Sequence, residues 1–304
     1  MCVSLGNALR QTGVVFTSPQ DVAQQLARVR YLPDAATATT VYLADTLGKP
    51  LLLEGPAGVG KTRLATAVAE ATDAELIRLQ CYEGLDEARA LYEWNYRKQL
   101  LRIQATTPTG ADGGWEQAHD DIFTEEFLLS RPLLQAIRGE RPAVLLIDEA
   151  DKTDVEVEAL LLEVLAEFQV TIPELGTVRA TRRPFVAVTS NATRELSEAL
   201  KRRCLYLHLD YPSPEREREI VLAQVPDLEA GLAEQLVRTV ATLRTLELKK
   251  APSVAETIDW ARTLLTLGIG TLDEAAIAQT LGAVLKHHTD HRRAAKELGL
   301  PDVV

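Results

Sequence analysis

The stretch 55–62 combines residue types that bind phosphate. It reads Gly-Pro-Ala-Gly-Val-Gly-Lys-Thr, with glycines, a lysine and a hydroxyl at the spacing of a phosphate-binding loop. Glycine allows tight turns that point successive backbone N–H groups inward, Lys61 can neutralise terminal phosphates, and the Thr62 hydroxyl can ligate Mg²⁺. We therefore predict a nucleoside triphosphate site made by Gly55, Pro56, Ala57, Gly58, Val59, Gly60, Lys61 and Thr62.

The flanks of this loop supply the expected context. Leu51–Leu53 is an apolar run suited to a strand buried on both faces, and residues 63–71 are rich in helix-forming alanine. The order of strand, loop and helix favours phosphate binding over a chance glycine turn beside a lysine.

Two carboxylates follow a second apolar run. Ala143–Ile147 leads into Asp148 and Glu149, so a buried strand would deliver both acids to the sheet edge that carries the phosphate loop. Asp148, nearer the strand, would hold Mg²⁺, and Glu149 would orient or deprotonate an attacking water. The alternative is a strand end whose acids are merely solvated.

A third apolar run, Phe185–Thr189, also ends in polar residues. Asn191 is placed to hydrogen-bond a γ-phosphate or to hold the attacking water. Taken alone, it could equally be a turn-forming asparagine.

Basic residues end a short helix predicted at 197–203. Lys201, Arg202 and Arg203 there would favour the negative end of the helix dipole, which is one explanation for them. The other is an arginine presented to the γ-phosphate of a neighbouring subunit, for which we favour Arg203 and place Arg202 second.

The elements that must position these residues indicate an α/β fold. Five apolar runs alternate with helical stretches, which predicts a parallel sheet of the P-loop NTPase type with helices on both faces. The predicted strands are Leu51–Leu53, Glu75–Gln80, Ala143–Ile147, Phe185–Thr189 and Leu205–Leu209, after a mostly helical lead-in at 10–47. We expect residues 1–210 to form this domain and 211–304 to form a small all-α lid with helices near 215–224, 228–246, 253–267 and 273–288.

One crossover of this sheet is unusually long. The pattern predicts a helix over 87–103 and a second over 123–137, with a polar, glycine-rich loop between them. We expect a helical insert at about 83–121, and such excursions usually carry function.

Composition limits the function classes. A formal net charge of -11 and a pI near 5.1 argue against nucleic-acid binding. The three cysteines lack metal-ligand spacing, and no stretch approaches the ~20 apolar residues of a membrane span, which indicates a cytoplasmic protein.

His287, His288 and His291 fit a solvated helix face better than a metal site, because Lys and Arg surround them.

Taken together, these stretches resemble the AAA+ ATPases, and within them the MoxR family, over nearly the whole chain. Residues 55–62, 145–149, 189–191 and 198–203 are similar to the Walker A, Walker B, sensor 1 and arginine-finger regions. Residues 80–86 and 90–96 resemble the branch associated with maturing molybdenum-containing carbon monoxide dehydrogenase and related hydroxylases.

The resemblance implies an ATPase that uses ATP and Mg²⁺ and forms a hexameric ring, with the nucleotide between subunits. It also implies an insert that faces the partner, a hairpin over 168–179, and a von Willebrand A-domain partner with which the ring remodels or matures a client, here a molybdenum hydroxylase. One departure is that Pro252-Ser-Val-Ala-Glu256 lacks the sensor 2 arginine of the family, and Arg262 lies nearly two turns later.

Two other functions are compatible with the same core. A nucleic-acid motor would use the same ATPase, although the acidic charge argues against it. A nucleotide-gated binding module with little hydrolysis would be consistent with the missing sensor 2 arginine, although Glu149 and Asn191 argue against it.

Overall fold

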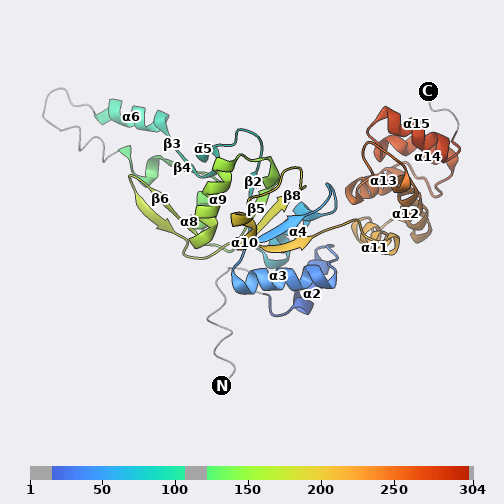
Figure 1. The fold of residues 1–304 in the computed structure, drawn as a ribbon, viewed down its shortest axis with the longest axis horizontal. Coiled ribbons are helices and arrows are strands. Elements are labelled where there is room, and N and C mark those ends of the chain that lie inside the picture. The colour runs from blue at the N-terminus through green and yellow to red at the C-terminus, as the bar shows by residue number, and fades with distance from the viewer. Residues whose placement is uncertain (1–15, 107–121, 301–304) are drawn as a thin grey trace, which may run out of the picture. The chain divides into compact units, whose positions relative to one another are not determined.

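The computed structural model describes residues 16–106 and 122–300 (Figure 1). These residues form two compact units. Of the described residues, the first unit takes in those up to Gln25, Asp34–Glu54 and those between Ala65 and Leu207. The second takes in Leu26–Pro33, Gly55–Leu64 and the described residues from His208 onward. The predicted loop over 107–121 lies outside the described residues.

The first unit is built on a five-stranded sheet with the strand order β2-β5-β8-β1-β9. The pairings of β2 with β5, β5 with β8, and β8 with β1 are parallel. The strands are β1 (Leu51–Glu54), β2 (Glu75–Gln80), β5 (Ala143–Asp148), β8 (Phe185–Ser190) and β9 (Leu205–His208). All five predicted strands are confirmed to within one residue at each end.

The central strands are covered on both faces. Every residue of β5 and of β8 is buried, and alternate side chains of a strand point to opposite faces of the sheet. Continuous burial therefore requires layers above and below, which explains why these strands read as unbroken apolar runs. The parallel α/β architecture is the one predicted from the sequence.

Helices surround this sheet in the chain order that the sequence indicated. They are α2 (Pro19–Arg28), α3 (Ala35–Leu47), α4 (Lys61–Thr72), α8 (Pro132–Arg138), α9 (Val155–Glu167) and α10 (Glu198–Arg203). The N-cap of α10 is Ser197, whose hydroxyl accepts from Leu200 N at 3.4 Å. This cap confirms the short basic helix predicted before β9.

The long crossover differs from its prediction. In place of one helix over 87–103, the chain forms α5 (Glu87–Ala90), β3 (Tyr92–Trp94) and α6 (Tyr96–Thr106). Strand β3 pairs antiparallel with β4 (Leu128–Ser130), which follows the 3₁₀ turn η1 (Glu125–Phe127), and Trp94 packs edge-on against Phe123. Pairing across the excursion outweighs local helix propensity, because it buries Trp94.

The predicted hairpin is present. Strand β6 (Gln169–Ile172) pairs antiparallel with β7 (Gly176–Arg179), and the turn between them contains Pro173. Gly176 has φ 80°, a left-handed conformation that glycine adopts without strain.

The chain from His208 is helical. It forms α11 (Pro214–Gln224), α12 (Ala230–Thr245), α13 (Val254–Thr266), α14 (Glu274–Thr280), the 3₁₀ turn η3 (Leu281–Ala283) and α15 (His288–Glu297). The first three match their predictions, but the helix predicted over 273–288 ends at Thr280, and a separate helix begins at His288. These helices share a hydrophobic core around Trp260. The indole of Trp260 is fully buried and donates to Thr280 Oγ1 at 2.7 Å.

Among the described helices, none is long and apolar enough to cross a membrane.

Candidate functional site

The predicted phosphate loop follows β1 directly in the chain. Gly55, Gly58 and Gly60 have φ values of 150°, 76° and 104°, which other residues rarely adopt. A Cβ atom would lie 1.9 Å from Leu209 O at Gly55 and 2.3 Å from Ser253 Oγ at Gly58. Both the conformation and the lack of space therefore require glycine at these two positions.

Lys61 begins helix α4 and turns back over the loop. Lys61 is buried, and its ammonium group donates to Gly55 O at 2.6 Å and to Pro56 O at 2.7 Å. The loop thus combines a positive charge with a helix N-terminus, which is the arrangement that binds phosphate in proteins. Thr62 occupies the next helical position, and its hydroxyl is an oxygen of the kind that ligates Mg²⁺.

Helix α13 contacts this loop within the second unit. Ala255 N donates to Gly58 O at 3.2 Å, and Ser253 and Glu256 form a capping box at the start of the helix. This is the segment where the resemblance leads one to expect a sensor 2 arginine. Arg262 lies on the exposed surface of α13 and pairs with Asp259 at 3.2 Å.

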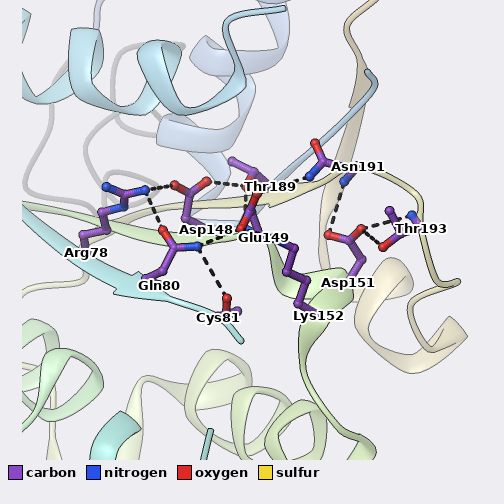
Figure 2. A network of polar contacts seen from close by, with 10 residues as sticks. All are labelled: Arg78, Gln80, Cys81, Asp148, Glu149, Asp151, Lys152, Thr189, Asn191 and Thr193. Carbon is purple, nitrogen blue, oxygen red and sulfur yellow. Dashed lines mark hydrogen bonds and ion pairs between the residues drawn. The ribbon is translucent and has the colours of Figure 1, made fainter. Parts of the chain in front are cut away.

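The two predicted acids lie at the carboxyl end of β5 in the first unit (Figure 2). Asp148 is buried, and its Oδ1 accepts from Thr189 Oγ1 at 2.6 Å. The same hydroxyl accepts from Glu149 N at 2.8 Å. One threonine at the end of β8 therefore fixes both acids of the neighbouring strand.

Glu149 adopts a left-handed conformation, with φ 58° and ψ 48°. Such a conformation costs of order 1–3 kcal/mol in a non-glycine residue and is frequent at functional sites. Its Oε2 accepts from Lys152 Nζ at 2.7 Å and from Gln80 Nε2 at 3.0 Å, whereas Oε1 lies 3.5 Å from Asn191 Nδ2. The geometry thus brings Glu149 and Asn191 together, with Oε1 in the weaker contact.

Six polar residues of this cluster were not predicted as site residues. They are Arg78, Gln80, Asp151, Lys152, Thr189 and Thr193. Asp151 accepts from Asn191 N at 3.2 Å and Thr193 N at 3.0 Å. Burial alone would raise the pKa of Asp151, but these bonds and that of the Thr193 hydroxyl outweigh it and lower the pKa. For Arg78 and Gln80 the sequence did contain a signal. The predicted strand Glu75–Gln80 ends in polar residues, and its carboxyl end lies beside Asp148 in the sheet.

The two predicted arginine-finger residues lie at the end of α10. Arg202 and Arg203 are exposed, and Arg203 Nη1 contacts the backbone oxygen of Ala199 at 3.4 Å. Lys201 instead pairs with Glu195 at 3.0 Å. Neither arginine has an acidic partner among the interactions of the described residues.

The loop and the acids, each taken by itself, fit a magnesium nucleotide chemically. The loop offers a glycine cradle in which a Cβ at Gly60 would meet only Tyr31, at 3.8 Å. The acids offer carboxylate oxygens, the ligands that Mg²⁺ prefers, at the end of a strand.

Comparison with known proteins identifies relatives of this chain. An uncharacterized protein of Staphylococcus aureus is 28% identical over 227 residues, which cover 73% of this chain and 77% of the relative. Denitrification regulatory protein NirQ of Stutzerimonas stutzeri is 27% identical over 218 residues, 69% of each chain. A solved mutant of RuvB from Thermotoga maritima aligns with 96% of this chain and 86% of its own, at 18% identity and a TM-score of 0.39.

Residues 50–204 also match the sequence model of a protein family, and this stretch contains the phosphate loop, both acids and Asn191. This match covers just over half of the 304 residues. The chain therefore belongs to the AAA domain family, dynein-related subfamily, a family of nucleotide-binding ATPases.

Proposed function

We propose that this protein is a MoxR-type AAA+ ATPase that hydrolyses ATP to remodel or mature a protein client. The observation that carries the proposal is the pairing of Asp148 and Glu149 through Thr189 at the carboxyl edge of the sheet. At the same edge, β1 ends at Glu54 and the chain enters the phosphate loop without an intervening residue. Phosphate-binding and hydrolytic residues thus arise from strands on either side of β8.

The residues divide the work as follows. Bound MgATP supplies the phosphoanhydride and a divalent charge. Lys61 and the N–H groups of the loop hold the phosphates, while Thr62 and Asp148 hold the metal. Glu149 accepts a proton from the water that attacks the γ-phosphorus, and its Oε1 faces Asn191, which orients that water.

The Glu149→Gln variant tests the hydrolytic role. We expect the hydrolysis rate to fall by about 10²-fold or more, since general-base catalysis contributes 10²–10⁴-fold. Binding of ATP should persist, because the loop is untouched. Glu163→Gln, at an exposed position of α9, is the matched control. Turnover by Glu149→Gln at the wild-type rate would refute the assignment.

The arginine finger belongs to the same proposal. Arg203, with Arg202 second, acts on the nucleotide of a neighbouring subunit in a hexameric ring, which the exposure of both side chains supports. Two inactive variants, Arg203→Ala and Glu149→Gln, should regain hydrolysis when mixed, because some interfaces then combine an intact finger with an intact base. If the mixture stays inactive although mixed rings form, Arg203 does not act across the interface.

The client and the partner protein are part of the same proposal. The resemblance of residues 80–86 and 90–96 to the carbon monoxide dehydrogenase branch favours a molybdenum hydroxylase as client and a von Willebrand A-domain protein as partner. The Glu149→Gln variant should retain ATP, partner and client together. Affinity capture with this variant tests whether these two proteins are the client and the partner. The control is Lys61→Ala, which cannot hold the nucleotide. Steep stimulation of ATPase activity by DNA would favour a nucleic-acid motor instead.

A further inference from the structure

The Asp148 carboxylate is almost fully desolvated and is already paired with a cation. Its side chain is 3% exposed, and its Oδ2 accepts from Arg78 Nη2 at 2.5 Å, while Oδ1 accepts from Thr189. Figure 2 shows Asp148 between these two partners. A buried carboxylate requires such compensation, because an unpaired charge in this environment is costly.

Arg78 is held by few contacts. Its side chain is 51% exposed, and the Nη2 atom that contacts Asp148 also donates to Gln80 Oε1 at 2.6 Å. By contrast, Arg244 in the second unit binds Glu217 through two nitrogens and is 14% exposed. Arg78 can therefore move into solvent once another cation compensates the charge of Asp148, whereas burial and two hydrogen bonds hold Arg244 in place.

The position of Arg78 on the sheet keeps it near the acid after release. Arg78 and Gln80 are two residues apart on β2, so their side chains share one face, and Gln80 lies opposite Asp148 in the register of β2 with β5. Gln80 can retain the guanidinium at the sheet edge without the Asp148 contact.

We propose that Arg78 is a resident counter-ion of Asp148 which Mg²⁺ must displace. The inference rests on the proposed function, in which Asp148 belongs to the metal site. A guanidinium and a divalent cation repel each other, and both compete for one buried carboxylate. Arg78 is thus a positioning residue: it stabilises the metal-free site and sets the Mg²⁺ concentration at which nucleotide binds.

The test is the Mg²⁺ dependence of binding of a fluorescent ATP analogue to the full chain. In Arg78→Met we expect the half-saturating Mg²⁺ concentration to fall by about 10-fold, a change of about 1.4 kcal/mol. Arg78→Lys, which keeps a cation, should stay near wild type, as should Arg89→Met, whose guanidinium contacts the Tyr82 hydroxyl. An unchanged or higher Mg²⁺ requirement in Arg78→Met would overturn the inference.

A second measurement uses the wild-type protein and does not depend on a variant that folds. Phenylglyoxal modifies exposed arginines, and mass spectrometry measures how much of Arg78 is modified. We expect severalfold more modification in protein incubated with nucleotide and Mg²⁺ than in protein incubated with nucleotide and EDTA. Unchanged or reduced modification would contradict displacement.

If the ATP analogue fails to bind the wild-type chain at any Mg²⁺ concentration, the proposed function itself fails. If it binds and only the Arg78 results are negative, this inference alone fails.

Discussion

The hydroxyl of Thr189 lies 2.6 Å from Asp148 Oδ1 and joins the ends of two adjacent strands. It donates to this carboxylate and accepts from the backbone of the next residue, Glu149, at 2.8 Å. Because Thr189 is 1% exposed, no water can replace these bonds without entering the sheet. The two acids of the site therefore share one structural support.

Replacement of Thr189 by valine should destabilise the protein. The change keeps the shape of the side chain but leaves a buried carboxylate oxygen and a backbone N–H without this partner, at a cost of about 1–3 kcal/mol. Unfolding in urea measures the loss, and Thr189→Ser should recover most of it. Thr171→Val, at an exposed hydroxyl that pairs with Thr177 in the hairpin, should cost less than about 0.5 kcal/mol. Equal losses at both positions would contradict this account.

The stabilisation from Asp151 should depend on pH. Its pKa is lowered in the folded protein because hydrogen bonds from Thr193 and Asn191 outweigh burial, which would raise it. The stabilisation is therefore complete above the unfolded-state pKa of about 3.9 and is lost as the pH falls through the lower folded-state pKa.

We thus expect the stability difference between wild type and Asp151→Asn to be constant from about pH 6 to 8 and to shrink below about pH 4. Urea unfolding across this range provides the measurement. Asp154→Asn is the control, because Asp154 is exposed and its side chain does not cap α9. A difference that does not vary with pH would show that the carboxylate charge of Asp151 does not matter.

Loss of Arg244 should be far more damaging than loss of Arg238 on the same helix, α12. Glu217 is 1% exposed and accepts from both Arg244 and Thr257, so Arg244→Met strands a buried charge at about 3–5 kcal/mol. Arg238 pairs with Glu234 at the surface, where such a pair is worth less than about 1 kcal/mol. Denaturant unfolding of both variants checks the contrast. Similar losses would rule out burial as the cause.

The thiol of Cys81 should resist alkylation in the folded protein. Burial raises its pKa to about 12, with a smaller contribution from nearby acids, chiefly Asp148. Burial likewise raises the pKa of Cys204 to about 12. Since the thiolate is the reactive form, iodoacetamide at pH 8 should label both only after unfolding, as peptide mapping would show. Rapid labelling of Cys81 in the native state would indicate that β2 opens locally.

Local residue patterns were sufficient to predict the sheet and the loop. Apolar runs such as Phe185–Thr189 predict buried strands because a strand covered on both faces favours apolar side chains, and the structure confirms them. The glycines at 55 and 58 were predictable because few other residues adopt their backbone conformation.

The long crossover was not predictable in the same way. Residues 87–103 contain apolar side chains at a spacing that suits a helix, yet Tyr92–Trp94 forms a strand. Its partner, Leu128–Ser130, lies more than thirty residues later in the chain. A short segment takes its conformation from such a partner, and nothing in a local window indicates that the partner exists.

The sequence by itself determined the phosphate loop, the parallel sheet and the two acids, because each depends on neighbouring residues and on hydrophobic periodicity. Only the tertiary structure decided the surroundings of those acids. Arg78 and Thr189 reach Asp148 because β2 and β8 flank β5 in the sheet, although the three strands are far apart in the chain. Strand order is set by packing of the whole domain, so side chains that meet across strands leave no local pattern.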